Sequence, residues 1–208
     1  MVVIGGHLHR SDPVLIAPES EIATPLGPLA VDRDLAAHIA DGVDAARDRH
    51  ADNTVEIQMP FVAYLFETTR VVYLRVPPAE VAIQVGELLA EYARTNSTGI
   101  RVIGSTDLSH YGPNYGSVEY GVGPEAARLV RENLDRPVVR LMLEMDAEAV
   151  IDHAVRTRSA CSSGAAAAAI SFARASGCLN AEEVGYHTSR EIQPADSFVG
   201  YAGIGFAP

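Results

Sequence analysis

Two short stretches of the sequence gather residue types that could do chemistry, and one of them is STDLSHYG at positions 105–112. Asp107 and His110 lie three residues apart there, in a polar loop that follows an apolar segment. A carboxylate at this spacing could orient the imidazole or set its pKa, which suits the pair to moving protons. The alternative is a turn in which Asp107 caps backbone amides and His110 lies at the surface. The spacing alone favours neither interpretation.

The second stretch is GGHLHR at positions 5–10, which carries His7 and His9. Side chains two residues apart in extended backbone point the same way, so both imidazoles could approach one metal ion. Gly5 and Gly6 would let the backbone bend sharply or pass close to a ligand. Many histidines at strand ends bind nothing, but we expect at least one of this pair to contact a metal or a substrate.

Cys161 stands immediately before an alanine-rich segment that is predicted to form a helix. The amide dipoles at such a position lower the pKa of a thiol, which makes a thiolate available for a metal or for nucleophilic attack. The alternative is a small buried hydrophobic residue. Cys178, near the end of the same helix, lacks this electrostatic help and is interpreted as structural.

Glu56, in DNTVEIQMPF, is an acid at the start of a predicted helix whose next turns are apolar. It could cap that helix, or it could project into a cavity as an acid, a base or a ligand. The remaining histidines have no partner pattern and are interpreted as satisfied or solvated: His38, His50, His153 and His187.

Apolar segments of strand length alternate with segments of helical periodicity along most of the chain. Strands are predicted at 2–4, 14–17, 70–77, 100–105, 184–189 and 197–206. Helices are predicted at 32–47 with Asp32 as N-cap, within 52–67, and at 81–94, 124–133 and 162–174, and one or two more are predicted within 138–156. This alternation predicts a single α/β domain over 1–208, with a mostly parallel or mixed central sheet and helices on both faces. Ligands collect outside the carboxyl ends of strands in such sheets, which is where GGHLHR and STDLSHYG fall.

Composition excludes several classes of function. The net charge of −11, with no basic cluster, argues against nucleic acid as a partner, and no apolar run is long enough to span a membrane. All 16 cationic residues are arginines, so a Schiff-base lysine and the lysine of a phosphate-binding P-loop are excluded. Two cysteines are too few for a disulfide framework, and with no signal peptide visible the cytoplasm is the expected location.

Six segments in order resemble the Memo family, whose bacterial and archaeal members are called AmmeMemoRadiSam system protein B. They are IGGHL, ATPLGPLAVD, DNTVEIQMPF, STDLSHYG, SACSSG and SFVGYAGIGF. The resemblance covers nearly the whole chain. It implies a fold similar to that of the class III extradiol ring-cleaving dioxygenases of the LigB type.

The resemblance also implies a metal pocket in which two histidines and one cysteine hold iron or copper. His7 matches the second histidine ligand, with His9 left open as the alternative, and Cys161 matches the cysteine ligand. Asp107 and His110 match the Asp and His of the family's S-S/T-D-x-x-H-x-G motif. Glu56 matches the last glutamate of its E-H-S-x-E segment.

This sequence departs from the family pattern at two places. Asn53 stands where E-H-S-x-E has its histidine, so that position cannot act as an imidazole acid or base. The family's first histidine ligand belongs to an H-A-G-Y segment upstream of the GGHL strand, where this chain begins, so we expect the chain to be N-terminally short relative to the family. Iron oxygenases usually present three protein ligands. Either His9, His110 or Glu56 could supply the third, or the site could have lost its metal.

The expected function is that of a Memo-like metal-binding protein acting as an iron- or copper-dependent, dioxygenase-like oxidoreductase on a small molecule. His7 and Cys161 would hold the metal, and His110, oriented by Asp107, would move protons. Ring cleavage itself is not expected, because ring-cleaving relatives use a carboxylate where this site has a thiolate. One alternative is a non-catalytic metal-binding or partner-binding protein that serves a radical S-adenosylmethionine protein. Another is a hydrolase with Cys161 as nucleophile and His110 as base. The oligomeric state is left open.

Overall fold

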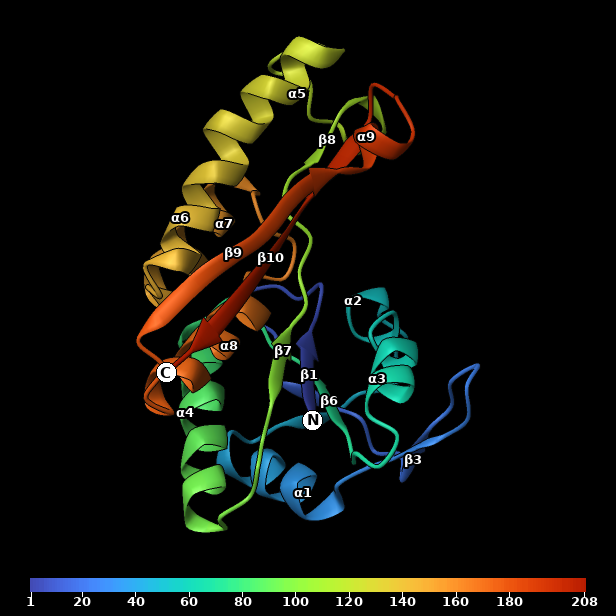
Figure 1. Cartoon of the computed structure of the whole chain (residues 1–208), viewed down its shortest axis with the longest axis vertical. Coiled ribbons are helices and arrows are strands. Elements are labelled where there is room, and N and C mark those ends of the chain that lie inside the picture. Colours follow the sequence, from blue (N-terminus) through green and yellow to red (C-terminus); the bar gives the residue numbers. More distant parts are fainter.

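A five-stranded mixed sheet of order β5-β2-β6-β1-β7 forms the centre of the fold, which a computed structural model describes over residues 1–208 (Figure 1). β1 runs parallel to both β6 and β7, whereas β2 is antiparallel to β6 and parallel to β5. The strands are β1 (Val2–Gly5), β2 (Leu15–Ile16), β5 (Ala46–Arg47), β6 (Val72–Arg75) and β7 (Val102–Gly104). The prediction of an α/β fold with a mixed sheet is therefore confirmed.

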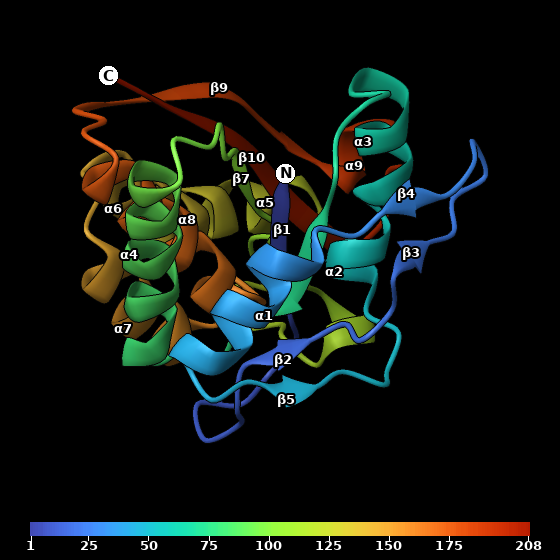
Figure 2. The ribbon, with the colours of Figure 1, turned by 90° about the horizontal axis from the view of Figure 1, so that it is seen from below.

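Both faces of β1 are buried, and successive side chains join different cores. Val2 and Ile4 belong to the larger core, which also contains residues of α4, α7 and α8, whereas Val3 belongs to a smaller core with residues of α2 and α3. Side chains alternate between the two faces of a strand, and a strand covered on both faces reads as a continuous apolar run. Figure 2 shows the consequence, with α4, α7 and α8 on one side of β1 and α2 and α3 on the other.

Nine α-helices surround the sheets. They are α1 (Arg33–Gly42), α2 (Asn53–Glu56), α3 (Met59–Leu65), α4 (Glu80–Thr95), α5 (Pro124–Val130), α6 (Arg136–Leu143), α7 (Ala147–Thr157), α8 (Ser163–Ala175) and α9 (Ser189–Ile192). A π-helical turn, Arg131–Asp135, joins α5 to α6, and a 3-10 turn lies at Pro113–Tyr115. The Asp32 side chain accepts a hydrogen bond from the Leu35 amide, so the predicted N-cap of α1 is confirmed. None of the helices has the length and apolarity that crossing a bilayer would require.

The alanine-rich helix α8 packs closely on its neighbours, as its small side chains predict. A Cβ atom added at Gly86 of α4 would lie 2.4 Å from the Ala168 carbonyl oxygen, and one added at Gly104 of β7 would lie 2.5 Å from that of Ala165. Neither neighbour is a flexible side-chain end, so both glycines are required by the backbone approach. Helix α8 is thereby held tightly against β7, whose following loop contains STDLSHYG.

Two smaller sheets complete the fold. β8 (His110–Tyr111), β10 (Phe198–Ala207) and β9 (Asn180–Thr188) form an antiparallel sheet in the order β8-β10-β9, and β3 (Glu21–Ile22) pairs with β4 (Leu29–Ala30). In β8, His110 pairs with Val199, and Tyr111 pairs with Phe198. The long strands β9 and β10 run beside the helical layer in Figure 1, and β10 holds the backbone of His110 in place.

Several predicted boundaries are wrong for local reasons. The helix predicted over 32–47 ends at Gly42, because Asp44 takes the left-handed conformation and Ala46–Arg47 pairs with β2 as β5. The polar loop after β7 contains β8, and the segment between β2 and α1 contains the β3-β4 hairpin. These short strands have little apolar periodicity, and their pairing partners are distant in sequence, so pattern alone did not indicate them.

Candidate metal and acid–base site

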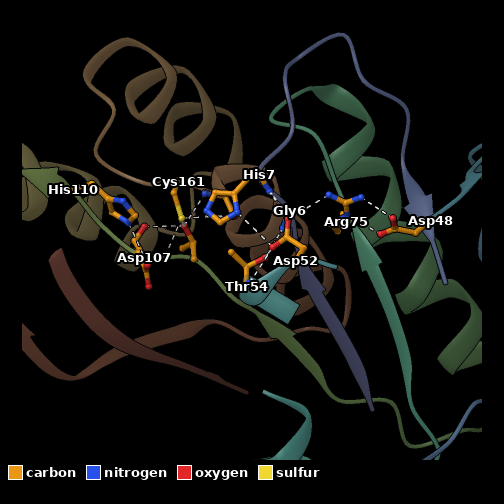
Figure 3. Close-up of polar contacts among 11 residues, drawn as sticks. Gly6, His7, Asp48, Asp52, Thr54, Arg75, Asp107, His110 and Cys161 are labelled. Atoms are coloured by element: carbon orange, nitrogen blue, oxygen red, sulfur yellow. Dashed lines mark hydrogen bonds and ion pairs between the residues drawn. The ribbon is translucent and has the colours of Figure 1, made fainter. Parts of the chain in front are cut away.

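Three parallel strands deliver the chemically reactive segments to one edge of the central sheet. β6, β1 and β7 are neighbours, and their carboxyl ends lead to Arg75, to Gly6 and His7, and to the loop that carries Asp107. Carboxyl ends of parallel strands share one edge, where α/β proteins bind ligands. The two stretches that the sequence marks are therefore neighbours in space, as Figure 3 shows.

Asp107, His110 and Cys161 form the central group of the site. The ligand atoms that they offer lie within 4.8 Å of one another, and all three residues are half-buried. Asp107 lies in the loop between β7 and β8 and His110 is the first residue of β8, whereas Cys161 comes from the turn before α8. This group could hold a metal ion, because a carboxylate oxygen, an imidazole nitrogen and a thiolate sulfur are all established ligands of transition metals.

The loop after β7 and the turn before α8 are joined by reciprocal hydrogen bonds. The Cys161 amide donates to the Asp107 carbonyl at 3.1 Å, and the Asp107 amide donates to the Cys161 sulfur at 3.3 Å. The Ser162 amide donates to the Thr106 hydroxyl oxygen at 2.9 Å. The loop's other side is held by β10, where Leu108 and Gly200 are linked by a backbone hydrogen bond of 2.9 Å. The central group is therefore preorganised by backbone as well as side-chain contacts.

Asp107 and His110 form a carboxylate–imidazole pair. Asp107 Oδ2 lies 3.1 Å from His110 Nε2, and the Tyr115 ring packs against the imidazole with 5.0 Å between ring centroids. The hydrogen bond with Asp107, and then the interaction with Cys161, raise the pKa of His110 to about 9. The imidazole therefore carries a proton at neutral pH and lies in hydrogen-bond contact with the Asp107 carboxylate.

The Cys161 thiol ionises more readily than an ordinary cysteine. Burial alone would raise its pKa, but the interaction with His110 and the hydrogen bond from the Asp107 amide lower it to about 7. A thiolate next to a protonated imidazole is the charge arrangement that makes a cysteine a good metal ligand or nucleophile. Cys178 also has a free thiol, but it is not part of the group.

His7 follows β1 and is held by Asp52, which caps α2. The His7 amide donates to Asp52 Oδ2 at 3.1 Å, and its ring Nδ1 lies 3.4 Å from Asp52 Oδ1. In Figure 3 the His7 ring is drawn between Asp52 and Cys161. Its side chain is 43% exposed, so the ring is accessible to a ligand from solution.

The glycines before His7 allow β1 to pass close to α2. A Cβ atom at Gly5 would lie 2.3 Å from the Thr54 hydroxyl oxygen, and Gly6 has a φ of +121° and donates its amide to that oxygen at 2.8 Å. Gly5 is required by the close approach of β1 to the start of α2, and Gly6 by its positive φ and by the nearby Arg75 of β6, 2.7 Å from an added Cβ atom. The sequence interpretation, a sharp bend or a close approach, thus has its structural reason.

A buried ionic network supports Asp52. Arg75 donates to both oxygens of Asp48 at 2.6 Å and to Asp52 Oδ2 at 3.3 Å, and all three side chains are almost fully buried. Burial would raise the pKa of Asp52, but hydrogen bonds from Thr54 and the His7 amide hold it below the usual value. Asp52 is therefore a carboxylate facing the His7 ring.

A cavity of about 850 Å³ opens beside the central group. Its lining includes Leu8, His9, Arg10, His110, Tyr115 and Cys161. Neither His7 nor Glu56 is part of this lining. His9 is exposed, with its amide donating to Asp12 Oδ2 at 2.7 Å, and Glu56 is exposed at the last position of α2.

Sequence reasoning overlooked Asp48, Asp52 and Arg75. A signal was available for Arg75, because an arginine inside the apolar strand segment VVYLRVP has to be paired with carboxylates when it is buried. The DNT triplet similarly indicates an aspartate N-cap at Asp52. The pattern could not show that these acids lie beside His7, because 45 residues separate His7 from Asp52 in the chain.

Comparison with known proteins assigns the family. The model of the Memo-like protein family matches residues 1–205. A MEMO1 family protein of Pyrococcus furiosus is 32% identical, over 98% of this chain and 74% of the relative. A MEMO1 family protein of Thermococcus onnurineus is 31% identical over 99% of this chain and 75% of the relative. One of Pyrococcus abyssi is 30% identical over 98% of this chain and 74% of the relative. The resemblance seen in the sequence is confirmed, and this chain belongs to the Memo-like protein family.

Proposed function

We propose that this protein is a metal-dependent oxidoreductase that uses iron or copper at the edge of the central sheet. The observation that carries the proposal is the position of Cys161, the proposed thiolate ligand, within 4.8 Å of the acid–base pair Asp107 and His110 and beside a cavity large enough for a small molecule. A soft thiolate and imidazoles are ligands that iron and copper accept. The substrate would be a small molecule that enters from the side of His9 and Arg10.

His7 and Cys161 are the proposed metal ligands, with His9 as the alternative to His7. When bound, iron or copper would supply one-electron chemistry and a Lewis-acidic centre. Cys161 is suited to this role because its lowered pKa makes the thiolate available near neutral pH. His7 is suited to it because Asp52 contacts one ring nitrogen, which leaves Nε2 without a hydrogen-bond partner in the protein.

His110 is the proposed proton carrier. Its raised pKa keeps it protonated at neutral pH, so it can donate a proton to a substrate oxygen in the cavity. Asp107 holds the ring in place through the 3.1 Å contact and stabilises its positive charge. Glu56, which is exposed at the end of α2, is proposed as a further acid or base. In that role its side chain would face the bound substrate.

Metal reconstitution under anaerobic conditions tests this proposal. Iron or copper should bind at about one ion per chain, and Cys161→Ala and His7→Ala should each abolish stoichiometric binding. Cys178→Ala is the matched control, because it removes the other free thiol and should leave binding unchanged. Binding that His9→Ala abolishes and His7→Ala does not would reassign the ligand to His9. No binding by the wild-type chain would contradict the proposal.

The charge state of Cys161 and His110 also favours a second candidate, a cysteine-dependent hydrolase. With pKa values of about 7 and about 9, the two side chains form a thiolate–imidazolium pair at neutral pH, which is the reactive state of cysteine nucleophiles. The test is turnover of thioester and ester substrates by metal-free protein. Activity that requires Cys161 and persists in the presence of a chelator would favour this candidate over the first.

A non-catalytic role is the third proposal, with a radical S-adenosylmethionine protein as partner and the cytoplasm as location. Metal binding without oxygen consumption across a panel of small aromatic and aliphatic substrates would favour it. In that case His110→Ala should leave metal stoichiometry unchanged and have no catalytic phenotype.

A further inference from the structure

We propose that Asp52 is a positioning residue for His7, and that Asp52, itself fixed by Arg75, sets which nitrogen of the His7 ring is free to bind. The inference rests on the proposed function, because it concerns the histidine assigned there to the metal. It goes further by giving a role to a buried ionic network that the metal site does not include.

Asp52 holds both the backbone and the ring of His7. One carboxylate oxygen accepts the His7 amide at 3.1 Å, and the other lies 3.4 Å from the ring Nδ1. The ring contact is an ion-pair contact and not a hydrogen bond in this structure, so it depends on the charge of the carboxylate. A negative charge at this place favours the tautomer that has its proton on Nδ1, which leaves the lone pair on Nε2.

The carboxylate of Asp52 is itself rigidly held. It accepts hydrogen bonds from the Thr54 amide at 3.0 Å, from the Thr54 hydroxyl at 2.5 Å and from Arg75 at 3.3 Å. Its side chain is only 5% exposed, so water does not compete strongly for these contacts. The oxygen that faces His7 therefore has one fixed position.

The buried network of Asp48, Asp52 and Arg75 has an excess of negative charge. Two carboxylates, Asp48 and Asp52, share the single guanidinium of Arg75, and Arg75 makes its two shorter contacts with Asp48. The uncompensated negative charge therefore lies chiefly on Asp52, beside the ring. Metal-ligating histidines commonly donate their second N–H to a carboxylate, which fixes the tautomer and strengthens the ligand.

A purely structural role is the competing explanation, since Asp52 also caps α2. Asp48→Asn is the matched control for this alternative. Asp48 is buried to a similar degree and binds the same arginine, but it has no contact with His7. Asp52→Asn keeps the shape of the side chain and removes its charge, so the two variants differ in whether the charge that faces His7 is removed.

The experiment measures the tautomer of His7 directly in the metal-free protein. Long-range ¹H–¹⁵N NMR correlations on the full chain with labelled histidine, recorded at a fixed pH where His7 is neutral, distinguish Nδ1–H from Nε2–H. His7→Gln assigns the signal. We expect the Nδ1–H form in the wild type and in Asp48→Asn, and a shift of population toward Nε2–H in Asp52→Asn. An unchanged tautomer in Asp52→Asn, or an equal shift in Asp48→Asn, would overturn the proposal.

A metal titration of the same variants provides the second measurement. Loss of a carboxylate behind a ligating histidine lowers metal affinity by about 10–100-fold, so Asp52→Asn should lose this much, and Asp48→Asn should not. If Asp52→Asn does not fold, Asp52→Ser replaces it, because a serine hydroxyl still caps α2. A wild-type chain that binds no metal while its tautomer still responds to Asp52→Asn would contradict the proposed function and support the positioning role.

Discussion

At the scale of single residues, the environment of Cys161 decides what the site can do. Its sulfur accepts the Asp107 amide at 3.3 Å and lies beside a histidine whose pKa is about 9. Burial raises the pKa of this thiol, but these two contacts, together with those of Ser162 and Thr106, lower it to about 7. Both catalytic functions considered for this protein, the metal-dependent and the hydrolytic one, use that thiolate.

The first prediction concerns the pH dependence of Cys161 alkylation in metal-free Cys178→Ala protein. Only the thiolate reacts, so a pKa of about 7 places the midpoint of the rate near pH 7, with faster reaction above it and slower reaction below it. Stopped-flow alkylation with iodoacetamide measures this profile. His110→Ala removes the neighbouring positive charge and should move the midpoint upward, toward the value near 8.5 of a free cysteine. A midpoint that His110→Ala leaves in place would disprove the coupling.

At the scale of elements, three parallel strand ends and the start of α8 position the site, and close backbone approach holds them. β7 is the edge strand of the central sheet, and its Gly104 contacts α8. The turn that carries Cys161 lies immediately before α8, and the loop that carries Asp107 follows β7 immediately. Any displacement between β7 and α8 therefore changes the distance between the carboxylate and the sulfur.

The second prediction is that Gly104→Ala destabilises the protein by about 1–3 kcal/mol, the usual cost of forcing a methyl group into a packed interior. The added methyl would lie 2.5 Å from the Ala165 carbonyl oxygen, so β7 and α8 have to separate. Urea unfolding measures the change. Gly99→Ala is the control, because nothing lies within 4 Å of its added Cβ, and its stability should change by less than about 0.5 kcal/mol. Equal losses of stability in Gly104→Ala and Gly99→Ala would show that the close packing of β7 on α8 does not account for the destabilisation.

The third prediction concerns the network that joins β6 to the N-cap of α2. Arg75→Met leaves two buried carboxylates without their cation, and breaking a buried ion pair in this way costs roughly 3–5 kcal/mol. Thermal and urea unfolding at neutral pH should show this loss. Because the hydrogen bonds with Arg75 help to hold the pKa of Asp48 below normal against the effect of burial, the difference between Arg75→Met and wild type should shrink as pH falls and Asp48 becomes protonated. A difference that stays constant with pH would contradict the electrostatic explanation.

At the scale of the whole molecule, the sequence predicted the architecture better than it predicted where individual helices and strands begin and end. Alternating apolar and amphipathic segments indicated the mixed sheet, because the continuous apolar run of β1 and the amphipathic period of α4 are each set by local burial. The short strands β5 and β8 could not be predicted in the same way, because their hydrogen bonds are made with partners far along the chain.

The residues of the candidate site could likewise be predicted only where the sequence signal is local. Asp107 and His110 were recognised because their partnership is local, three residues apart, and Cys161 because of its position before a helix. The meeting of these residues within 4.8 Å depends on the packing of α8 on β7, which composition does not encode. Asp52 was overlooked because it caps α2, whereas its partner His7 follows β1, 45 positions earlier in the chain.

The most direct test of the central claim, a metal held by the Cys161 thiolate, is X-ray absorption spectroscopy of protein reconstituted with iron or copper. The account predicts one sulfur ligand at roughly 2.3 Å, the distance typical of metal–thiolate bonds, together with scattering from imidazole. Cys178→Ala should give the same spectrum, and Cys161→Ala should lose the sulfur contribution. A bound metal surrounded only by oxygen and nitrogen in the wild-type protein would contradict the account.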